Sequence, residues 1–361
     1  MKGPFNPIEF PIPEKYINLN KYVKELTEAY SKMGEFNAKM QETQIPFTYA
    51  INHMLKLESL YSTRIEGTQT TIDAVYEADI DSNKRQNSDI KEVLRYNEAL
   101  KTASKSVETS SITLKLIKEI HKILLQGDIR KNSDFIAGRF REQQNRVGEH
   151  IPPVATDVEK WMSNLERYIN DDYGYEDNLP AVIKAALIHA QFETIHPFPD
   201  GNGRVGRVLI PIYLYKQKVI TSPYFFLSQE LEKNSIRYYS YLQGTRTLTE
   251  KGFSDWIKFF LQSIINQTDS DIRFIDNINA LYTETLQKMK SYITTNNDEV
   301  FIKAIFKNPI FTTDTLYNET GIYKNSLRNY ISILKNNQII FSGGQKRNTK
   351  YYFMELLDLM K

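Results

Sequence analysis

The run from His196 to Arg207 holds the residues of this sequence best suited to bind a phosphate group. Gly201 and Gly203 can adopt backbone conformations closed to other residues, so the turn they flank can direct successive N–H groups at an anion. A helix that begins near Gly203 would add its unpaired N–H groups and the positive end of its dipole. Arg204 and Arg207 would share one face of that helix and could both reach a polyphosphate. The run therefore predicts a nucleotide-binding loop.

Two titratable side chains of the same run could supply chemistry. His196 can accept a proton near neutral pH. Asp200 offers an oxygen ligand for magnesium at the rim of the loop. The structural alternative is a Pro-Asp-Gly-Asn-Gly turn that joins two helices, since turns of this composition are common. The histidine before the turn and the arginines after it favour the functional interpretation.

Every fixed position of the pattern HPFx(D/E)GNGRxxR is met between residues 196 and 207, so the chain resembles the Fic family. The resemblance extends from about residue 15 to residue 270. It implies a mostly α-helical fold, a Fic-type helical bundle with a β-hairpin flap. The implied reaction is transfer of AMP from ATP onto a Tyr, Thr or Ser hydroxyl of a target protein, or of the chain itself, with pyrophosphate as the leaving group.

The resemblance gives each reactive side chain of the loop a role. His196 would be the general base that deprotonates the target hydroxyl. Asp200 would hold Mg²⁺ between the α- and β-phosphates. Arg204 would engage the β-phosphate, and Arg207 the γ-phosphate. ATP and Mg²⁺ are the small molecules that this scheme requires.

The remaining loop residues would shape the nucleotide pocket. Gly201, Asn202 and Gly203 would line the anion pocket at the α-phosphate. Phe198 would point into the core and hold the loop in place. Tyr239 stands where family members place residues of the nucleoside pocket, although tyrosines on a helix more often serve packing.

A second motif lies upstream of the loop. The segment Ser62-Thr63-Arg64-Ile65-Glu66-Gly67 resembles the inhibitory pattern (S/T)xxxE(G/N) of the same family, with Ser62, Glu66 and Gly67 at its fixed positions. A helix end with one surface glutamate is the structural alternative. A bidentate pair between Glu66 and Arg207 would occupy the group that should hold the γ-phosphate, and would leave ATP misaligned for attack. We therefore expect autoinhibition.

The segment 138–153 has no helical periodicity and predicts a short β-hairpin or an ordered loop. It resembles the flap that Fic proteins use to position a target. A target protein could add an extended segment to its edge and so present a hydroxyl to His196. Arg139 and Arg141 suit either this docking surface or a purely structural hairpin.

Helical periodicity dominates the rest of the chain, including helices at 181–195, 228–243, 253–267 and 271–290. His189 reads as a packed histidine, and His53, His121 and His150 show no metal-ligand spacing. The expected organisation is an N-terminal helical region (1–110, with the inhibitory motif at 62–67), a Fic catalytic core (111–270), a linker helix (271–295) and a winged helix-turn-helix (296–361).

The C-terminal unit offers a function of a different class. Its predicted order of helix, helix, turn, helix and hairpin is that of a winged helix-turn-helix. Basic and amide side chains of the recognition helix and the wing could contact DNA phosphates and bases. They are Lys324, Asn325, Arg328, Asn329, Lys346, Arg347 and Lys350. A DNA-binding regulator with a nucleotide-sensing Fic core is therefore an alternative, as is a partner or homodimer surface.

The amino-acid composition narrows the possible classes of protein further. With 361 residues, 41% hydrophobic, 25% charged and a net charge of +2, the chain suits a soluble globular protein. It has no cysteine, which excludes disulfides and thiol catalysis. No apolar run approaches the roughly 20 residues of a membrane span, so a cytoplasmic protein without membrane contact is expected.

Within the Fic fold, three other activities stay open. Doc-like kinases carry Lys where Gly203 stands here, and phosphocholine transferases bind their substrate inverted, so the intact loop favours AMP transfer. Removal of AMP from a modified target is the third possibility, because Glu66 could orient a water molecule.

Overall fold

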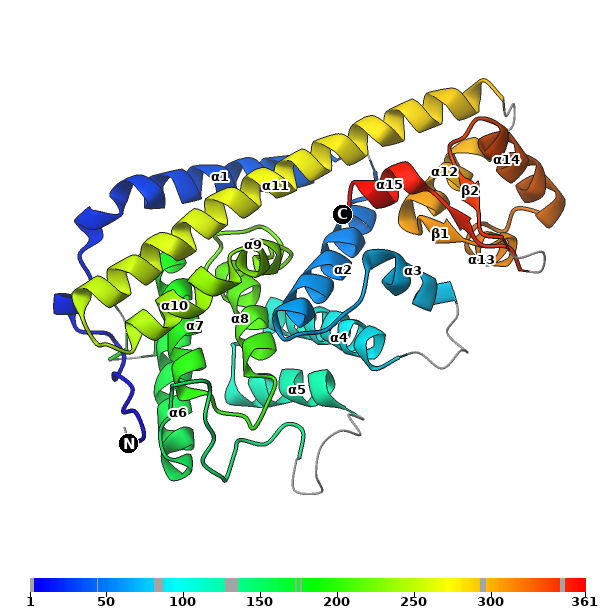
Figure 1. Cartoon of the computed structure of the whole chain (residues 1–361). Coiled ribbons are helices and arrows are strands. Elements are labelled where there is room, and N and C mark those ends of the chain that lie inside the picture. Colours follow the sequence, from blue (N-terminus) through cyan, green and yellow to red (C-terminus); the bar gives the residue numbers. More distant parts are fainter. Residues whose placement is uncertain are drawn as a thin grey trace. The chain divides into compact units, whose positions relative to one another are not determined.

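The computed structural model describes residues 3–43, 45–80, 87–126, 136–172, 174–175, 177–292, 297–344 and 348–361 (Figure 1). The chain is mostly α-helical with a small antiparallel sheet, as the sequence predicts. Lys346 and Arg347, which the sequence places in the wing, lie outside the described residues. Within the described residues, no helix has both the length and the apolar character needed to cross a membrane.

The chain divides into two compact units that exchange segments of the sequence. The first comprises Met1–Glu35, Tyr61–Thr68 and Leu94–Thr268, and the second comprises Phe36–Leu60, Gln69–Val93 and Asp269–Lys361. Four of the five boundaries fall inside helices, namely α1 (Val23–Gln41), α2 (Phe47–Ile65), α4 (Ser88–Thr109) and α11 (Glu250–Lys290), and the fifth, after Thr68, follows the end of α2.

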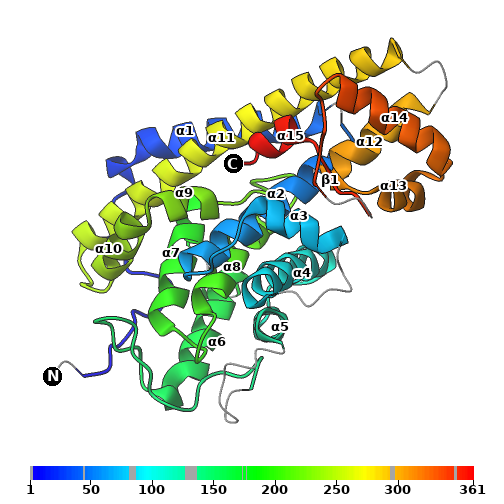
Figure 2. The same ribbon diagram turned by 45° about the vertical axis from the view of Figure 1, so that its right-hand side comes forward.

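In the first unit, helices α7 (Ala181–Ile195) and α8 (Asn202–Lys216) pack side by side at the centre (Figures 1 and 2). Almost every residue of α7 is buried, because the helix carries apolar or small side chains on all of its faces and can pack against neighbours all round. This agrees with the central buried helix predicted for 181–195. The surrounding elements are α5 (Leu114–Leu125), α6 (Val158–Ile169), α9 (Ser228–Lys233), α10 (Ser235–Thr245) and short 3₁₀ helices at Glu14–Tyr16, Leu19–Lys21 and Ala155–Asp157.

Two predicted helix boundaries are wrong for identifiable reasons. The sequence predicts one helix over 228–243, but the chain breaks at Asn234, whose side-chain amide donates to the carbonyl of Glu230 at 3.1 Å. The sequence also predicts separate helices at 253–267 and 271–290, whereas α11 is continuous. No glycine or proline interrupts α11 between them, and the hydroxyl of Thr268 bonds the carbonyl of Ile264 within the helix.

The second unit contains α3 (Ile72–Ile80) and the C-terminal elements. These are α12 (Asp298–Lys307), β1 (Ile310–Phe311), α13 (Thr313–Thr320), α14 (Lys324–Asn336), β2 (Phe341–Ser342), β3 (Tyr351–Tyr352) and α15 (Met354–Asp358). The strands form an antiparallel sheet in the order β1-β3-β2. A capping box of Thr312 and Thr315 starts α13, and Gly321 ends it at φ 69°.

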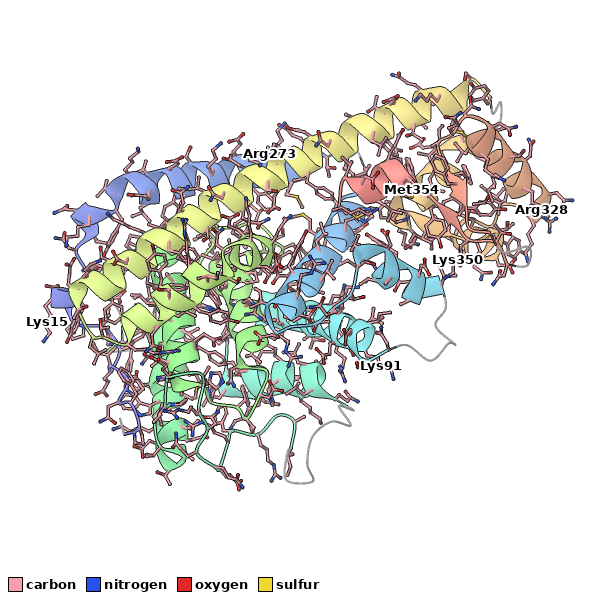
Figure 3. All side chains as sticks on the ribbon, in the orientation of Figure 1. Lys15, Lys91, Arg273, Arg328, Lys350 and Met354 are labelled. Carbon is pink, nitrogen blue, oxygen red and sulfur yellow. The ribbon has the colours of Figure 1, made fainter. Side chains whose placement is uncertain are left out.

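Two basic side chains of the C-terminal elements are already engaged within the second unit. The ammonium group of Lys350 lies 2.7 Å from Glu77 of α3, and Lys324 lies 2.6 Å from Asp314. Arg328 projects from the exposed side of α14 (Figure 3). Binding of DNA or of a partner by this unit stays a prediction.

Candidate active site

His196 and Gly201 mark the two ends of the loop between α7 and α8. The N–H of His196 still bonds the carbonyl of Phe192 at 2.9 Å, but His196 itself turns left-handed, with φ 49°. Pro197 follows and cannot continue the helix. Gly201, at φ 77°, is the residue before the first turn of α8, and no side chain caps that helix. The catalytic histidine of the prediction therefore lies at a helix end, opposite a helix start with unpaired N–H groups.

Asn202 and Phe198 close the loop by two reciprocal hydrogen bonds. The amide oxygen of Asn202 accepts from the N–H of Phe198 at 2.8 Å, and its amide nitrogen donates to the carbonyl of Phe198 at 2.8 Å. The phenyl ring of Phe198 is fully buried, as the sequence predicts. Asn202 thus shapes the anion pocket by fixing its backbone, since its own side chain is buried and used within the loop.

His121 of α5 packs against this loop and bonds its backbone, a role that the sequence does not reveal. Its ring stacks on Phe198, with centroids 3.8 Å apart and planes 5° apart. Its Nδ1 accepts from the N–H of Gly138 at 2.8 Å, so the proton is on Nε2, which donates to the carbonyl of Asp200 at 3.0 Å. His121 therefore ties the start of the segment 138–153 to the catalytic loop.

Arg141 is a second support of the loop. Its Nε donates to the carbonyl of His196 at 2.9 Å, and its guanidinium also bonds the carbonyls of Pro153 and Ile195. The side chain is buried, and burial lowers the pKa of Arg141. Of the two interpretations that the sequence leaves open for Arg141, the structure shows the structural one. Arg139 is exposed.

The segment 138–153 is an ordered loop with one antiparallel bridge, in which the N–H groups of Val147 and His150 each bond the other's carbonyl at 2.9 Å. It contains no regular strand pair, so the loop alternative of the sequence is the one observed. His150 donates from Nε2 to the carbonyl of Thr194 at 2.9 Å and holds the loop against α7.

Arg207 and Glu66 form the ion pair that the second motif predicts. NH2 of Arg207 lies 2.7 Å from Oε1 of Glu66, and the arginine side chain is 1% exposed. Burial, the largest single influence, would lower the pKa of Arg207, but the carboxylate of Glu66 together with Tyr238, Tyr96 and Tyr239 outweighs it and raises that pKa. The predicted bidentate geometry is not seen, because Nε of Arg207 donates to the hydroxyl of Ser62 at 2.8 Å and NH2 also bonds the Ser62 carbonyl at 2.9 Å.

The end of α2 positions Glu66 by a Schellman motif. The N–H of Thr68 bonds the carbonyl of Thr63 at 3.2 Å, and the N–H of Gly67 bonds the carbonyl of Arg64 at 2.9 Å. Gly67 is left-handed at φ 95°, which glycine adopts without strain. The chain therefore stops the helix directly after Glu66 and aims its carboxylate at α8.

Gly203 leaves the space in which the carboxylate of Glu66 lies. A Cβ at this position would clash with Oε1 of Glu66 and would stand 3.0 Å from NH1 of Arg207. Arg204, one residue later, is buried, and its NH2 lies 3.7 Å from the carboxylate of Asp200. The carboxylate of Glu66 thus lies at the first turn of α8, where an anion would bind.

His196 is poised as a neutral base. Its side chain is 15% exposed, and Nδ1 is buried without a hydrogen-bond partner among the described residues. Burial, together with the cations Arg246 and Arg141 and with His150, lowers the pKa of His196 to about 3. The imidazole is therefore unprotonated over the physiological range and can accept a proton.

Two of the three tyrosines of α10 lie close to the candidate site, and they differ in burial. Tyr239 is half exposed, and partial burial and the nearby carboxylate of Glu66 raise its pKa to about 12. The predicted nucleoside-pocket residue thus lies beside the Glu66–Arg207 pair. Tyr238 is fully buried and shares a hydrogen bond of 2.8 Å with Nε2 of His189, a contact that the sequence does not suggest.

The carboxylate of Asp200 is the candidate magnesium ligand. It is about half exposed, and Oδ1 accepts from the N–H of Gly201. No group of three or more His, Asp or Glu side chains suited to a metal exists in the part of the chain that the structure describes. Magnesium is usually held by one or two carboxylates together with substrate phosphates and water, and Asp200 offers one such carboxylate.

Comparisons with known proteins agree with this geometry. A model of the Fic/DOC family matches residues 111–214, and a model of the Fic/DOC family N-terminal region matches residues 23–105. Together they cover more than half of the chain, so this chain belongs to the Fic/DOC family.

Solved structures show the same fold. A Fic family protein from Desulfovibrio desulfuricans superposes with a TM-score of 0.58 over 94% of this chain and 97% of that chain, at 19% identity. A Fic domain containing signaling protein from Bacteroides thetaiotaomicron gives 0.55 over 70% of this chain and 97% of that chain, also at 19% identity.

Curated relatives named protein adenylyltransferase Fic are similar to the central part of the chain. The protein from Drosophila melanogaster is 33% identical over 160 residues, which are 43% of this chain and 31% of the relative. That from Drosophila ananassae is 36% identical over 126 residues, 35% of this chain and 24% of the relative. The chain thus spans about a third or less of the length of these relatives.

Proposed function

We propose that this protein is an adenylyltransferase that moves AMP from ATP to a hydroxyl side chain of a target protein. The observation that carries the proposal is the placement of a neutral histidine, His196, beside the uncapped start of α8 and its buried Arg204 and Arg207. A base next to a polyphosphate site is what attack of a hydroxyl on a nucleotide phosphorus requires. The curated relatives that carry the name adenylyltransferase support the choice of AMP.

The chain's own residues can perform the transfer. The N–H groups of the first turn of α8 would bind the α-phosphate and stabilise the charge that develops on it. Nε2 of His196 would take the proton of the hydroxyl as the new O–P bond forms and the bond to pyrophosphate breaks. Asp200 would hold Mg²⁺, which when bound offsets charge on the departing pyrophosphate.

Autoinhibition is part of the same proposal. Arg207 is the arginine placed to hold the γ-phosphate, and in this structure it bonds Glu66 and Ser62. A triphosphate would have to displace the carboxylate of Glu66 from Gly203 before it could bind in line for attack. The expected resting enzyme is therefore weakly active.

We propose the loop 138–153 as the place where the target protein docks. Its exposed residues, Arg139 among them, lie on the segment whose other side chains support the catalytic loop. An extended target segment paired with backbone groups of this loop would reach His196 without side-chain recognition.

The test compares wild type, Glu66→Gly and His196→Ala in reactions with ATP labelled at the α-phosphate. Loss of a charge-assisted pair worth about 1.5–3 kcal/mol should raise label incorporation in Glu66→Gly about tenfold or more. Mass spectrometry should find AMP on hydroxyl residues of this variant and none in Glu66→Gly/His196→Ala. Transfer of phosphate alone would indicate a Doc-like kinase instead. No modification by a folded Glu66→Gly protein that binds ATP would refute the proposal.

A further inference from the structure

Helix α7 carries two buried polar side chains, His189 and Glu193, that have no role in the transfer described above. They are four residues apart and so share one face of the helix, and His196 follows Glu193 by three residues, directly after the helix end. By hydrogen-bond geometry one polar atom in each of these three residues, Nδ1 of both histidines and Oε1 of Glu193, is buried without a partner among the described residues, although the backbone of Gly206 and of Glu193 raises the pKa of His189 and of His196 in part. Buried polar atoms without partners are rare and suggest a functional site.

Glu193 lies next to the catalytic histidine. Its Oε2 is 3.9 Å from Nδ1 of His196, and its side chain is 10% exposed. The distance exceeds a hydrogen bond, as catalytic contacts often do before substrate binds. Since Nδ1 is covered, Nε2 is the nitrogen of His196 left to take a proton from a target.

Gly206 provides the room for the carboxylate of Glu193. A Cβ at this position would lie 2.5 Å from Oε1 of Glu193 and 3.2 Å from Nδ1 of His189. The absence of a side chain at Gly206 therefore lets the glutamate pack between α7 and α8 rather than turn toward solvent.

We propose that Glu193 is a positioning residue for His196: its carboxylate accepts Nδ1–H, so that Nε2 is free to act as the base. When Nε2 takes the proton of the attacking hydroxyl, the O–P bond to the target forms and the bond to pyrophosphate breaks. The imidazolium that results is then stabilised by the adjacent carboxylate, in the way a triad carboxylate stabilises its histidine. This inference rests on the proposed function.

The protonation state of Glu193 decides whether the arrangement works. Burial raises the pKa of Glu193 to about 7, although Arg207 lowers it in part. Below that pH a protonated Glu193 would donate to Nδ1 and leave the proton of the neutral ring on Nε2, where it blocks the base. Activity should therefore rise as the pH increases through this pKa, which lies below 7 in Glu66→Gly because that variant lacks the carboxylate of Glu66 that helps to raise it.

Charged and titratable groups face Glu193 and His196 from every element packed against them. They are Glu66, His150, Arg141, His189, Arg207, Tyr238, Tyr239 and Arg246. Arg207 is paired with Glu66, and the pKa of His189 is lowered to about 3 by burial, so neither changes charge near pH 7. Burial, Arg246 and Arg141 lower the pKa of His150 to about 4, well outside the same range. Glu193 is thus the group expected to titrate there.

The first experiment measures AMP transfer from pH 5.5 to 9 in Glu66→Gly, which lacks the proposed inhibitory carboxylate, and in Glu66→Gly/Glu193→Gln. Glu193→Gln should lower the maximal rate about 10- to 100-fold and abolish the rise of activity with pH, while the Kd for ATP stays within about twofold. The matched control is Glu230→Gln, a buried glutamate of the same unit whose Oε1 accepts from Asn234 and Asn266 away from the loop. It should leave rate and pH profile unchanged.

A second variant keeps the glutamate and displaces it. Gly206→Ala should push the carboxylate of Glu193 away from Nδ1 and lower the rate in the same direction as Glu193→Gln. Rates of both variants within about twofold of the parent, with the same pH profile, would overturn the role of Glu193.

The third readout does not need activity, so failure of the adenylyltransferase proposal can be told from failure of this one. In protein labelled with ¹⁵N-histidine, the His196 signals are those lost in His196→Ala. Their side-chain nitrogen shifts should change with an inflection at the pKa of Glu193, below pH 7, in the Glu66→Gly protein and lack it in Glu66→Gly/Glu193→Gln. No inflection in the first protein, or the same inflection in both, would show that Glu193 does not act on His196.

Discussion

The carboxylate of Glu66 lies against the backbone of Gly203, in the space that a Cβ at position 203 would fill. The same carboxylate oxygen is 2.7 Å from NH2 of Arg207. Glycine at this position of the signature therefore has two consequences. It opens the first turn of α8 to an anion, and it lets the protein's own glutamate take the place of that anion.

This contact predicts a coupling between positions 66 and 203. Gly203 has no left-handed φ, so alanine fits the backbone, and in the Glu66→Gly background the guanidinium of Arg207, 3.0 Å from the added Cβ, still opposes it; Gly203→Ala should there change stability by less than about 1 kcal/mol. In wild type the methyl group collides with the carboxylate, and the same change should destabilise by about 1–3 kcal/mol. Urea unfolding of the four proteins measures the coupling. Equal effects of Gly203→Ala in both backgrounds would show that the carboxylate does not occupy this space.

Ser62 should contribute to inhibition through Arg207. Its hydroxyl accepts from Nε at 2.8 Å and holds the guanidinium where Glu66 meets it. Loss of one such bond is worth roughly 1 kcal/mol, so Ser62→Ala should raise automodification about three- to tenfold, less than Glu66→Gly does. The matched control is Ser59→Ala, because the Ser59 hydroxyl bonds the carbonyl of Leu55 within its own helix. Equal label incorporation in Ser62→Ala and wild type would contradict this role.

Arg141 should matter to catalysis although it touches no substrate. Lysine keeps the charge but cannot bond the carbonyls of His196, Pro153 and Ile195 together, so Arg141→Lys should destabilise the protein by about 2–4 kcal/mol. A catalytic histidine misplaced by about 1 Å should also cost roughly 100-fold in the rate of AMP transfer by the Glu66→Gly protein.

The control for this prediction is two residues away. Arg139→Lys changes an exposed arginine of the same loop and should not alter the unfolding free energy. If Arg139→Lys lowered the rate and Arg141→Lys did not, the loop residue that acts on catalysis would be the exposed one.

The sequence predicts the parts of the site that depend on local spacing. The turn at Gly201, the shared face of Arg204 and Arg207 and the helix end at Gly67 all follow from residue types a few positions apart. The pairing of Glu66 with Arg207 joins residues far apart in the chain and was accessible only through the family resemblance.

The side chains that hold the backbone of the loop in place could not be predicted from local spacing. Arg141 and His121 act on carbonyl groups of a distant loop, and backbone carbonyls leave no mark in the sequence. Glu193 did leave a signal. It is a charged residue on a helix whose positions are mostly apolar, and it lies four residues after His189 and three before His196.

The buried histidines predict how the stability of the first unit depends on pH. Burial lowers the pKa of His150 to about 4 and those of His189 and His196 to about 3, against an ordinary value near 6.5. Between these values the unfolded chain binds protons that the folded unit does not, so stability is lost as the pH falls below about 6.5. Each histidine should contribute about 1.4 kcal/mol per pH unit.

The titration of Glu193 raises the free energy of unfolding as the pH falls, opposite to the histidines, over part of this pH range. Its pKa is raised to about 7 in the folded unit, so between about pH 4.5 and 7 the folded unit holds a proton that the unfolded chain has lost. Three histidines less one glutamate leave a net slope of about 3 kcal/mol per pH unit between pH 6.5 and 4.5. Denaturant unfolding at several pH values measures it.

The Glu193→Gln variant separates the two contributions. Without the opposing proton, its unfolding free energy should fall with decreasing pH about 1.4 kcal/mol per unit more steeply than that of wild type. The Glu230→Gln control should keep the wild-type slope. An identical slope in Glu193→Gln and wild type would mean that Glu193 is ionised in the folded protein below pH 7, and would remove the basis for a rise of activity at that pH.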